Sequence, residues 1–308
     1  MPRVSRLVPV FAPRILPLLL LLLSLGACAQ RHAAPADAPR EGVLLVAFGT
    51  SVPEAMDSMR AVDAAFKAAF PGRPVVWAYT SQIIRKKLAA EGRPVGGISD
   101  GLAQLAGQGV RVVRVQSLHV MAGQEFSALE RALLLDVKKH PGRFEAVFLG
   151  RPMLESREDA RELARAVLAD ASPLRRKGEA LVLMGHGQEH GRAGLTFEGA
   201  RAVFHDADRK VFMATVEGAR GVEDLLRELK AAKVRKAVLA PFMLVAGDHA
   251  RNDLAGAEED SWASQLARAG IGMSANLKGL GQIAGARDIL VRHARESRDD
   301  LTKEPRKQ

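Results

Sequence analysis

The stretch Leu181–His190, LVLMGHGQEH, decides how the chain is interpreted. Its first four residues are apolar, as in a buried strand of a parallel sheet, and Gly185-His186-Gly187 then indicate a loop. In open α/β sheets, ligands bind in the loops at the carboxyl ends of the strands. A histidine between two glycines has little side-chain cover, so His186 can present its imidazole to a ligand. A histidine that only caps a helix or bonds to the backbone is the competing interpretation.

The composition of the chain is that of an ordinary globular protein, with 47% hydrophobic and 26% charged residues among 308. Aromatic residues make up only 5%, which argues against a stacking surface for single-stranded nucleic acid. The short basic runs at 85–87 and 175–177 are expected to be solvated faces, so we expect no nucleic-acid partner. The net charge of +10 favours an anionic partner such as anionic lipid or a polycarboxylate small molecule.

Residues 1–28 have the organisation of a secretory leader. Three arginines precede the apolar run 15–25, which is too short for a comfortable membrane span, and small residues follow it. Leu25-Gly26-Ala27-Cys28 resembles the lipobox of bacterial lipoproteins, in which the cysteine becomes the lipidated first residue; simple cleavage after Ala29 is the alternative. Both interpretations predict export to the periplasm, and the first predicts membrane anchoring through Cys28 rather than through a transmembrane helix.

Cys28 is the only cysteine, so the chain has no internal disulfide and no cysteine-based metal site. Any metal must be held by histidine and carboxylate. Residues 29–41 are rich in Ala, Pro and Arg without periodicity, which predicts a tether. The charged segment 297–308 has no apolar face and is expected to be a frayed tail.

Strands and helices are predicted to alternate from residue 42 to residue 296, which indicates an α/β fold with mostly parallel sheets flanked by helices. The predicted strands are Val43–Phe48, Val75–Tyr79, Val112–Gln116, Phe144–Leu149, Leu181–Met184, Val211–Val216, Ala237–Phe242 and about Gly272–Leu277. The predicted helices are about 53–70, 81–90, 101–107, 125–140, 155–171, 195–209, 222–232, 258–269 and 284–295. The pattern divides into an N-terminal half, 42–172, and a C-terminal half, 173–296.

The two halves resemble each other at three strand ends, in the same order. Leu44–Ser51 aligns with Leu181–Gln188, which places Phe48 opposite His186 when a one-residue offset is allowed. Two further alignments place Ser81 opposite Glu217 and Glu125 opposite His249. No single match is strong, but the shared order predicts an internal duplication, with two similar α/β domains that face each other.

The second half carries the residue types that bind metals. His186 follows its first strand, Glu217 its second and His249 its third, so neighbouring parallel strands would bring all three to one edge. Two imidazoles and one carboxylate suit a divalent first-row ion with open coordination positions, whereas a closed structural zinc site needs a fourth protein ligand. Three unrelated surface or capping residues are the alternative that spacing alone leaves open.

These residues lie in motifs that resemble the anaerobic sirohydrochlorin cobaltochelatases of the CbiK type, in the class II chelatase superfamily. The resemblance extends over about Gly42 to Arg295, and its most specific part is Pro241–Ala250, PFMLVAGDHA. The other motifs that carry it are Gly185-His186-Gly187 with Glu189-His190, Val216-Glu217-Gly218, Asn252–Gly256, Glu259–Trp262, Val46–Ser51 and Tyr79-Thr80-Ser81.

The resemblance implies two Rossmann-like halves with a cleft between them, and insertion of Co²⁺ into sirohydrochlorin, a polycarboxylate tetrapyrrole. The family's metal-binding and catalytic residues fall on His186, Glu217 and His249. Metallation removes water from the ion and two protons from pyrrole nitrogens, so a site that holds the ion and an imidazole that accepts a proton suit the reaction. His186 is the better candidate for the base, because its glycine neighbours allow a macrocycle to approach, and Glu217 is the candidate orienting ligand.

The N-terminal half is expected to supply the opposite wall of the substrate pocket. The candidate pocket residues are His119, Glu125, Ser81 and Phe48. Candidates for pairing with substrate carboxylates are Arg85, Lys86 and Arg251. The remaining helical histidines are expected at the surface; these are His140, His205 and His293. His190 is expected at the start of a helix rather than behind His186.

An export signal departs from the family pattern, because cobalamin assembly is mainly cytoplasmic. Insertion of Fe²⁺, as in ferrochelatases of related fold, therefore stays open as an alternative activity. A non-enzymatic alternative is an envelope lipoprotein that binds haem or metal, with His119 or another histidine as an axial ligand. Homo-oligomerisation also stays open.

Overall fold

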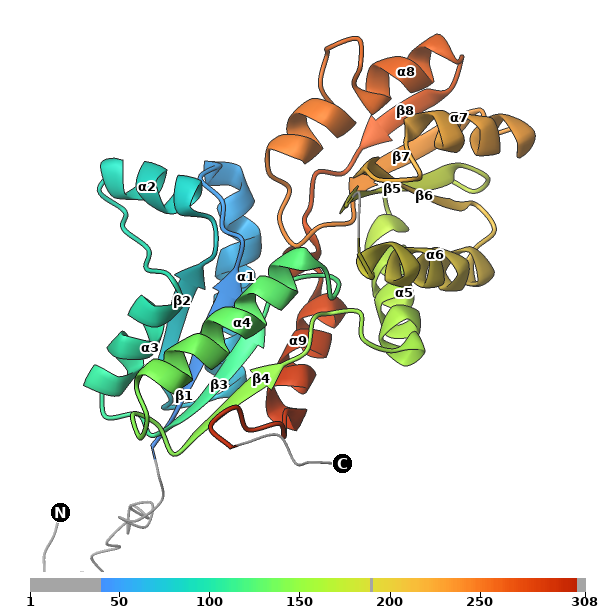
Figure 1. The fold of residues 1–308 in the computed structure, drawn as a ribbon. Helices are drawn as coiled ribbons and strands as arrows, with labels where there is room; N and C mark the ends of the chain where they lie inside the picture. Colours follow the sequence, from blue (N-terminus) through green and yellow to red (C-terminus); the bar gives the residue numbers. More distant parts are fainter. Residues whose placement is uncertain (1–39, 189–190, 304–308) are drawn as a thin grey trace, which may run out of the picture. The chain divides into compact units, whose positions relative to one another are not determined.

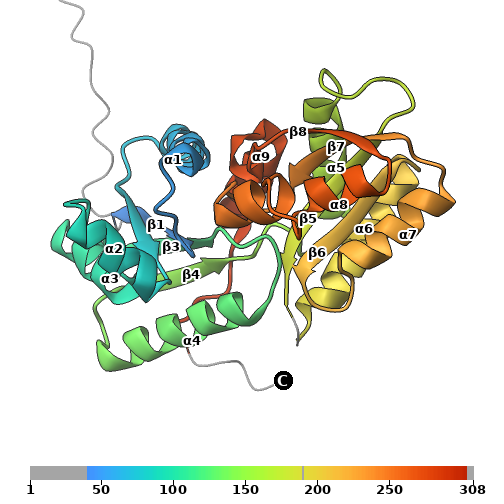
Figure 2. The same ribbon diagram turned by 90° about the horizontal axis from the view of Figure 1, so that it is seen from above.

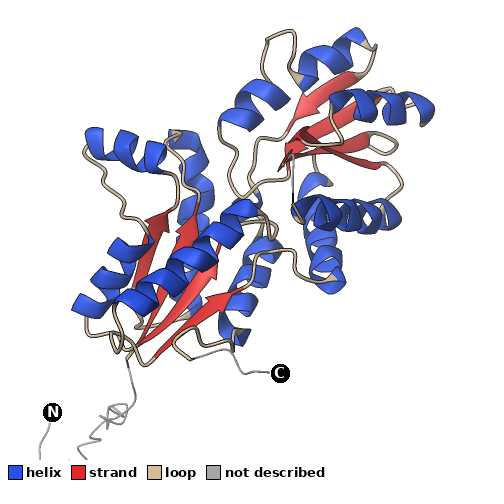
Figure 3. Cartoon of the chain, in the orientation of Figure 1, coloured by secondary structure: helices blue, strands red, loops and turns tan. Residues whose placement is uncertain are grey.

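The computed structural model describes residues 40–188 and 191–303, and these form two four-stranded parallel sheets flanked by helices (Figures 1 and 3). The predicted leader 1–28 and most of the tether lie outside the described residues, as do Glu189 and His190. Residues 39–308 belong to one compact unit, so the boundary between halves near residue 172 stays a prediction. In the described part of the chain, no helix is long and apolar enough to span a membrane.

The N-terminal sheet has the strand order β2-β1-β3-β4. Its strands are β1 (Glu41–Ala47), β2 (Val75–Tyr79), β3 (Val112–Ser117) and β4 (Ala146–Gly150). The helices of this half are η1 (Pro53–Ala55), α1 (Met56–Ala69), α2 (Gln82–Ala90), α3 (Ile98–Gly107) and α4 (Gln124–Lys139). β1 is buried on both faces, which explains why its sequence is continuously apolar, as is typical of a central strand in a parallel sheet.

The C-terminal sheet has the strand order β6-β5-β7-β8. Its strands are β5 (Ala180–Gly187), β6 (Val211–Glu217), β7 (Lys236–Pro241) and β8 (Gly272–Ala275). The helices from the crossover onward are α5 (Arg157–Ala171), α6 (Ala193–Ala207), α7 (Val222–Ala231), the π-helix η2 (Ala250–Leu254), α8 (Trp262–Arg268), η3 (Leu280–Gln282) and α9 (Ala284–Glu296). All eight predicted strands and all nine predicted helices are therefore present, with ends shifted by a few residues.

Both sheets have the same order, in which the second strand of the half precedes the first, third and fourth, as the predicted duplication requires. The strand registers agree with the sequence alignment of the halves. Val46 pairs with Ser117 in the first sheet, and Met184 pairs with Pro241 in the second. Continued along the chain, this register makes Phe48 the counterpart of His186 and Glu125 the counterpart of His249, as the alignment predicts.

The hydrophobic cores follow the alternation of side chains along the central strands. In β1, Leu44 and Val46 face α3 and α4, whereas Val43 and Leu45 face α1 and α9. In β5, Val182 and Met184 pack in a core with α7 and α8. The other face of β5 shares one buried cluster with α5, α6 and the α1–α9 side of the first sheet, which joins the two halves.

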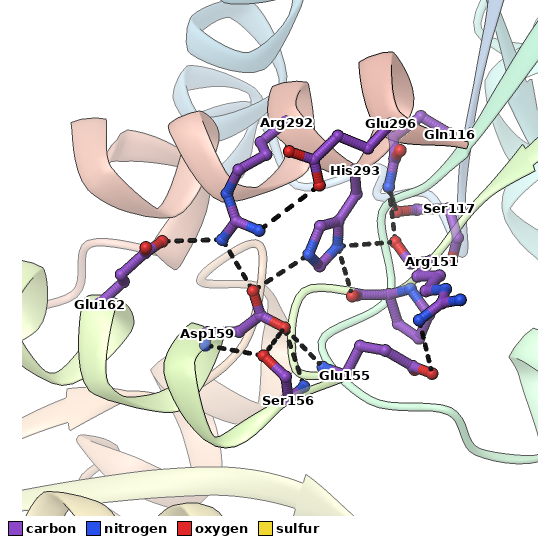
Figure 4. A network of polar contacts seen from close by, with 11 residues as sticks. Gln116, Ser117, Arg151, Glu155, Ser156, Asp159, Glu162, Arg292, His293 and Glu296 are labelled. Atoms are coloured by element: carbon purple, nitrogen blue, oxygen red, sulfur yellow. Dashed lines mark hydrogen bonds and ion pairs between the residues drawn. The ribbon is translucent and has the colours of Figure 1, made fainter. Parts of the chain in front are cut away.

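The last helix, α9, packs against β3, β4, α1 and α5, so the end of the chain returns to the N-terminal half (Figure 2). His293 on α9 is buried, and the expectation that it lies at the surface is wrong. Its Nδ1 lies 3.0 Å from the carbonyl oxygen of Pro152, and its Nε2 lies 3.1 Å from Asp159 Oδ1 (Figure 4). The position of His293 near the end of a helix does not reveal these partners, because Pro152 lies between β4 and α5 and Asp159 lies in the first turn of α5.

Asp159 is the centre of this polar network. It accepts hydrogen bonds from Arg292 at 2.7 Å and from the hydroxyl of Ser156, which caps α5. Burial raises the pKa of Asp159, but hydrogen bonds from Arg292 and Ser156 and the charge of His293 outweigh burial and hold the pKa below its ordinary value. The network therefore fixes the start of α5 to α9 through charged groups (Figure 4).

The segment 297–303 is ordered against β4, and the expectation of a frayed tail is wrong there. Leu301 N–H donates to the carbonyl of Val147 at 2.8 Å, and Val147 N–H donates to Asp300 Oδ1 at 3.1 Å. These bonds satisfy the outer edge of β4, which has no neighbouring strand on that side in the described sheet. Residues 304–308 lie outside the described part.

Candidate functional site

His186 lies within β5, not in a loop after it. The strand continues through Gly185-His186-Gly187, and Gly187 pairs with Glu217 at the end of β6. The prediction of a loop is wrong because pairing with β6 keeps the two glycines in the strand. Gly187 has φ +80°, and a Cβ atom there would lie 1.9 Å from the carbonyl oxygen of Glu217. Only glycine lets the two strand ends approach this closely.

Glu217 is the last residue of β6. Residues 218–220 follow it and fold back against the strand. The N–H of Thr215 donates to the carbonyl of Arg220 at 2.8 Å, and the Arg220 guanidinium bonds to Glu198 on α6 and Glu228 on α7. Burial raises the pKa of Glu198, but hydrogen bonds from Arg220 and Arg201 outweigh it and hold the pKa below its ordinary value. This ion-pair network holds the turn that carries Glu217.

His249 lies immediately before the π-helix η2, in helical conformation with φ −57° and ψ −41°. Single π-turns are rare and occur often at functional sites. The imidazole Nδ1–H donates to Asp253 Oδ2 at 2.5 Å, one turn further along the chain. The sequence predicts His249 after the third strand of its half, but it does not reveal the contact with Asp253.

The structure brings the three predicted metal-site residues to the same edge of the sheet. The ring centroids of His186 and His249 are 4.7 Å apart, with their planes nearly perpendicular, and His186 Nδ1 lies 3.9 Å from Glu217 Oε2. The three side chains are 41–52% exposed. They are therefore close to one another and accessible from solvent.

In these side-chain positions, no group of three His, Cys, Asp or Glu residues in the described ranges is arranged to hold a metal ion. One reason is that both imidazoles are turned toward oxygen acceptors: His186 Nδ1 lies 3.0 Å from the carbonyl oxygen of Gly187, and His249 bonds to Asp253. Half-exposed side chains can reorient when an ion binds. The assignment of His186, Glu217 and His249 as metal and catalytic residues stays a prediction.

In the N-terminal half, His119 and Glu125 form a pair after β3. The His119 side chain is only 10% exposed, with Nδ1 2.9 Å from Ser117 Oγ and Nε2 3.3 Å from Glu125 Oε2. Glu125, in the first turn of α4, is half exposed. A buried imidazole beside an exposed carboxylate can relay a proton, which agrees with their predicted place in the substrate pocket without testing it.

The other predicted pocket residues have different environments. Ser81 is buried, and its hydroxyl accepts a hydrogen bond from Ile84 N–H as the cap of α2, so its side chain has a structural role. Phe48 is 47% exposed just beyond β1. Arg85 lies against Gly97 and 3.8 Å from Asp100 at the start of α3, which is a structural pairing within this half.

The carboxyl edges of the two sheets meet through two contacts. Gln124 N–H, after β3, donates to Gln188 Oε1, after β5, at 3.3 Å. Arg251 on η2 lies 3.9 Å from Glu54, which follows β1. Gln188 and Arg251, which lie two residues from His186 and His249 in the sequence, thus contact the N-terminal half, and the substrate pocket itself stays a prediction.

A family model described as "Cobalt chelatase (CbiK)" matches residues 41–299, nearly all of the described chain. The sirohydrochlorin cobaltochelatase CbiKC of Nitratidesulfovibrio vulgaris Hildenborough is 33% identical over 254 residues, which cover 82% of this chain and 89% of the relative. The sirohydrochlorin cobaltochelatase of Salmonella typhimurium LT2 is 33% identical over 263 residues, covering 84% and 96%.

Two solved structures of the Bacillus subtilis sirohydrochlorin chelatase SirB resemble the fold. The complex with cobalt has a TM-score of 0.59 at 12% identity and covers 83% of this chain and 94% of its own. The structure with Fe³⁺ has a TM-score of 0.62 at 13% identity, with coverages of 83% and 95%. At these identities the likeness is one of fold, and it confirms the predicted two-sheet α/β architecture.

Proposed function

The chain belongs to the cobalt chelatase (CbiK) family, and on this premise we propose that it is a sirohydrochlorin cobaltochelatase, an enzyme that inserts Co²⁺ into sirohydrochlorin. The observation that carries the proposal is the convergence of His186, Glu217 and His249 at one sheet edge inside the region of the family match. Two relatives that carry this activity by name each align with more than four-fifths of the chain.

The residues divide the reaction between binding the ion and accepting protons. His186, Glu217 and His249 hold Co²⁺ and replace part of its water shell, because imidazole and carboxylate suit a divalent first-row ion. Insertion releases two protons from the pyrrole nitrogens, and an imidazole accepts one of them. His186 is the closest to an incoming macrocycle, since glycines on both sides leave its ring uncovered.

Arg251 is the residue best placed to receive a carboxylate of the substrate. It follows His249 by two residues, its Nε is buried with no hydrogen-bond partner among the described residues, and its contact with Glu54 is long at 3.9 Å. The side chain is 35% exposed, so a substrate carboxylate can reach the outer part of the guanidinium. The net charge of +10 favours the approach of a polycarboxylate substrate.

The test is a continuous visible-absorption assay with purified protein, sirohydrochlorin and Co²⁺. Many turnovers per protein are expected, and His186→Ala and His249→Ala are each expected to lower kcat/KM by at least about a hundredfold, as for loss of a general base. Full activity in both variants contradicts the site assignment. A single stoichiometric spectral change contradicts an enzyme and favours a binding protein, and parallel assays with Fe²⁺ decide the metal.

We also propose that the protein is exported and anchored in the periplasm through lipidated Cys28. The support is the sequence of the leader, with its arginines, apolar run 15–25 and Leu25-Gly26-Ala27-Cys28. Cys28→Ser is expected to move the protein from the membrane fraction to the soluble fraction or to block its maturation. Unchanged membrane association of the variant would contradict lipidation.

A further inference from the structure

Asp253 makes a direct side-chain contact with one of the candidate metal ligands. Its Oδ2 lies 2.5 Å from His249 Nδ1, and both side chains are about two-fifths exposed. A carboxylate and an imidazole at this distance form a short, charge-assisted hydrogen bond. Glu217, the carboxylate among the candidate ligands, is 3.9 Å from His186 Nδ1 and is left available for an ion.

The contact determines which nitrogen of His249 can bind a metal. An ionised carboxylate only accepts hydrogen bonds, so the proton of the neutral ring is on Nδ1 and the lone pair is on Nε2. His186 reaches the same tautomer through the carbonyl of Gly187. The two rings therefore both offer Nε2 to an ion, but only in His249 does a side chain impose this form.

The packing of the segment around Asp253 rests on apolar residues. The segment η2 is anchored by Ala250 and Leu254, which are completely buried, whereas the Asp253 side chain is 42% exposed and lines a cavity of about 480 Å³ with Thr215 and Trp262. The carboxylate of Asp253 therefore contributes a hydrogen bond with His249 rather than apolar packing.

We propose that Asp253 is a positioning residue for metal binding, which fixes the tautomer and orientation of His249 and makes its Nε2 a better ligand for Co²⁺. The inference rests on the proposed function of His249 as a ligand. Carboxylates that receive the second N–H of a metal-binding histidine contribute about 10–100-fold in metal affinity in other sites. In the sequence Asp253 lies within the motif Asn252–Gly256, but its contact with His249 depends on the π-turn that brings the two side chains together.

The experiment compares Asp253→Ala and Asp253→Asn with Asp260→Ala in the full-length protein. Asp260 is a matched control, because its exposed carboxylate lines the same cavity and the variant removes the same charge. Co²⁺ binding is followed through the visible ligand-field absorption of the ion, without sirohydrochlorin, and the KM for Co²⁺ and kcat are then measured with sirohydrochlorin.

Asp253→Ala is expected to weaken Co²⁺ binding by about 10–100-fold, to change the ligand-field spectrum and to raise the KM for Co²⁺ more than it lowers kcat. Asp253→Asn, whose amide oxygen still accepts from Nδ1, is expected to recover part of the affinity. Asp260→Ala is expected to match the wild-type protein, and all three variants are expected to keep the wild-type thermal midpoint.

The inference is overturned if Asp253→Ala and Asp260→Ala weaken Co²⁺ binding equally, since that result reports only the lost charge. It is also overturned if Asp253→Ala lowers the thermal midpoint and leaves the spectrum unchanged, or if the wild-type protein binds no Co²⁺. A wild-type protein that binds Co²⁺ but does not metallate sirohydrochlorin contradicts the proposed function alone, because the binding series still decides the role of Asp253.

Discussion

Gly187 is the residue on which the geometry of the candidate site depends most directly. It pairs with Glu217 across the ends of β5 and β6, and it adopts φ +80°, a conformation that side chains other than glycine rarely take. Because Gly187 has no side chain, it does not cover the imidazole of the neighbouring His186. A single glycine therefore sets both the approach of the two strands and the access to the imidazole.

Gly187→Ala is expected to lower both stability and activity. The positive φ alone costs about 1–2 kcal/mol, and the added methyl group would overlap the carbonyl oxygen of Glu217. The strand end must shift to relieve this overlap, which moves Glu217 away from His186. Urea unfolding and the Co²⁺-insertion assay measure the two effects.

Gly199→Ala is the control for Gly187→Ala. Gly199 lies in α6 with no atom within 4 Å of an added Cβ, so alanine is expected to stabilise the helix by about 0.5–1 kcal/mol and to leave activity unchanged. If Gly187→Ala unfolds at the wild-type urea concentration with full activity, the close approach of the strand ends is not essential to the site.

At the level of elements, the packing of α9 on α5 depends on the network of Asp159, Arg292 and His293 (Figure 4). Both ring nitrogens of His293 face oxygen acceptors, so the ring donates both bonds only in its protonated form. The Asp159 side chain is 2% exposed, and removing its charge takes the carboxylate partner from the His293 ring and one carboxylate partner from Arg292, which also bonds to Glu162. The element contact is thus maintained by charge as well as by apolar burial.

Asp159→Asn is expected to lower the free energy of unfolding by about 3–5 kcal/mol, the range for breaking a buried ion pair. Because the pKa of Asp159 is lowered in the folded protein, its contribution is present above the ordinary carboxyl pKa and is lost as pH falls through the lowered value. The variant should therefore lose stability less steeply than wild type on acidification from about pH 5 to pH 3.

Urea titrations at several pH values check this prediction. Asp206→Asn is the matched control, since Asp206 and Arg209 form an exposed pair with side chains 60% and 73% exposed. Such pairs contribute at most about 1 kcal/mol, so this variant should keep the wild-type pH dependence. If the two substitutions change the stability and its pH dependence equally, the buried network has no special role.

The sequence predicts the elements better than it predicts their ends and contacts. Apolar runs such as Val182–Met184 and Val238–Leu239 locate buried strands because both faces of a parallel sheet are covered. The strand character of Gly185–Gly187 was missed because pairing with β6 outweighs the low strand propensity of glycine. The π-turn at Ala250–Leu254 has no sequence period of its own, so Asp253 could not be linked to His249.

The local motif Gly185-His186-Gly187 indicates one residue of the candidate site, and the internal repeat predicts that the three candidate residues share one sheet edge. Alignment of the halves placed His186, Glu217 and His249 at equivalent strand ends, and the parallel registers place them together. His293 shows the limit of such reasoning. Its position near the end of a helix predicts exposure, and only the return of α9 to the N-terminal half explains its burial.

The whole molecule is a duplicated fold with different chemistry at its two equivalent sheet edges. The C-terminal edge carries His186 and His249, and the register makes Phe48 and Glu125 their counterparts in the N-terminal edge. A phenylalanine cannot ligate a metal ion, but a ring that is 47% exposed beside a substrate site can pack on the face of a tetrapyrrole. The repeat therefore predicts that the C-terminal edge binds the ion and that the N-terminal edge binds the macrocycle.

Phe48→Ala is therefore expected to raise the KM for sirohydrochlorin roughly tenfold to a hundredfold, the effect of about 1.5–3 kcal/mol of lost apolar burial. The dissociation constant for Co²⁺, measured without sirohydrochlorin, is expected to stay at its wild-type value. Leu135→Ala, which removes an exposed apolar side chain near the far end of α4, should change neither quantity. If Phe48→Ala weakens Co²⁺ binding and leaves the KM for sirohydrochlorin unchanged, the two edges are not specialised in this way, and the ion and the macrocycle share one set of residues.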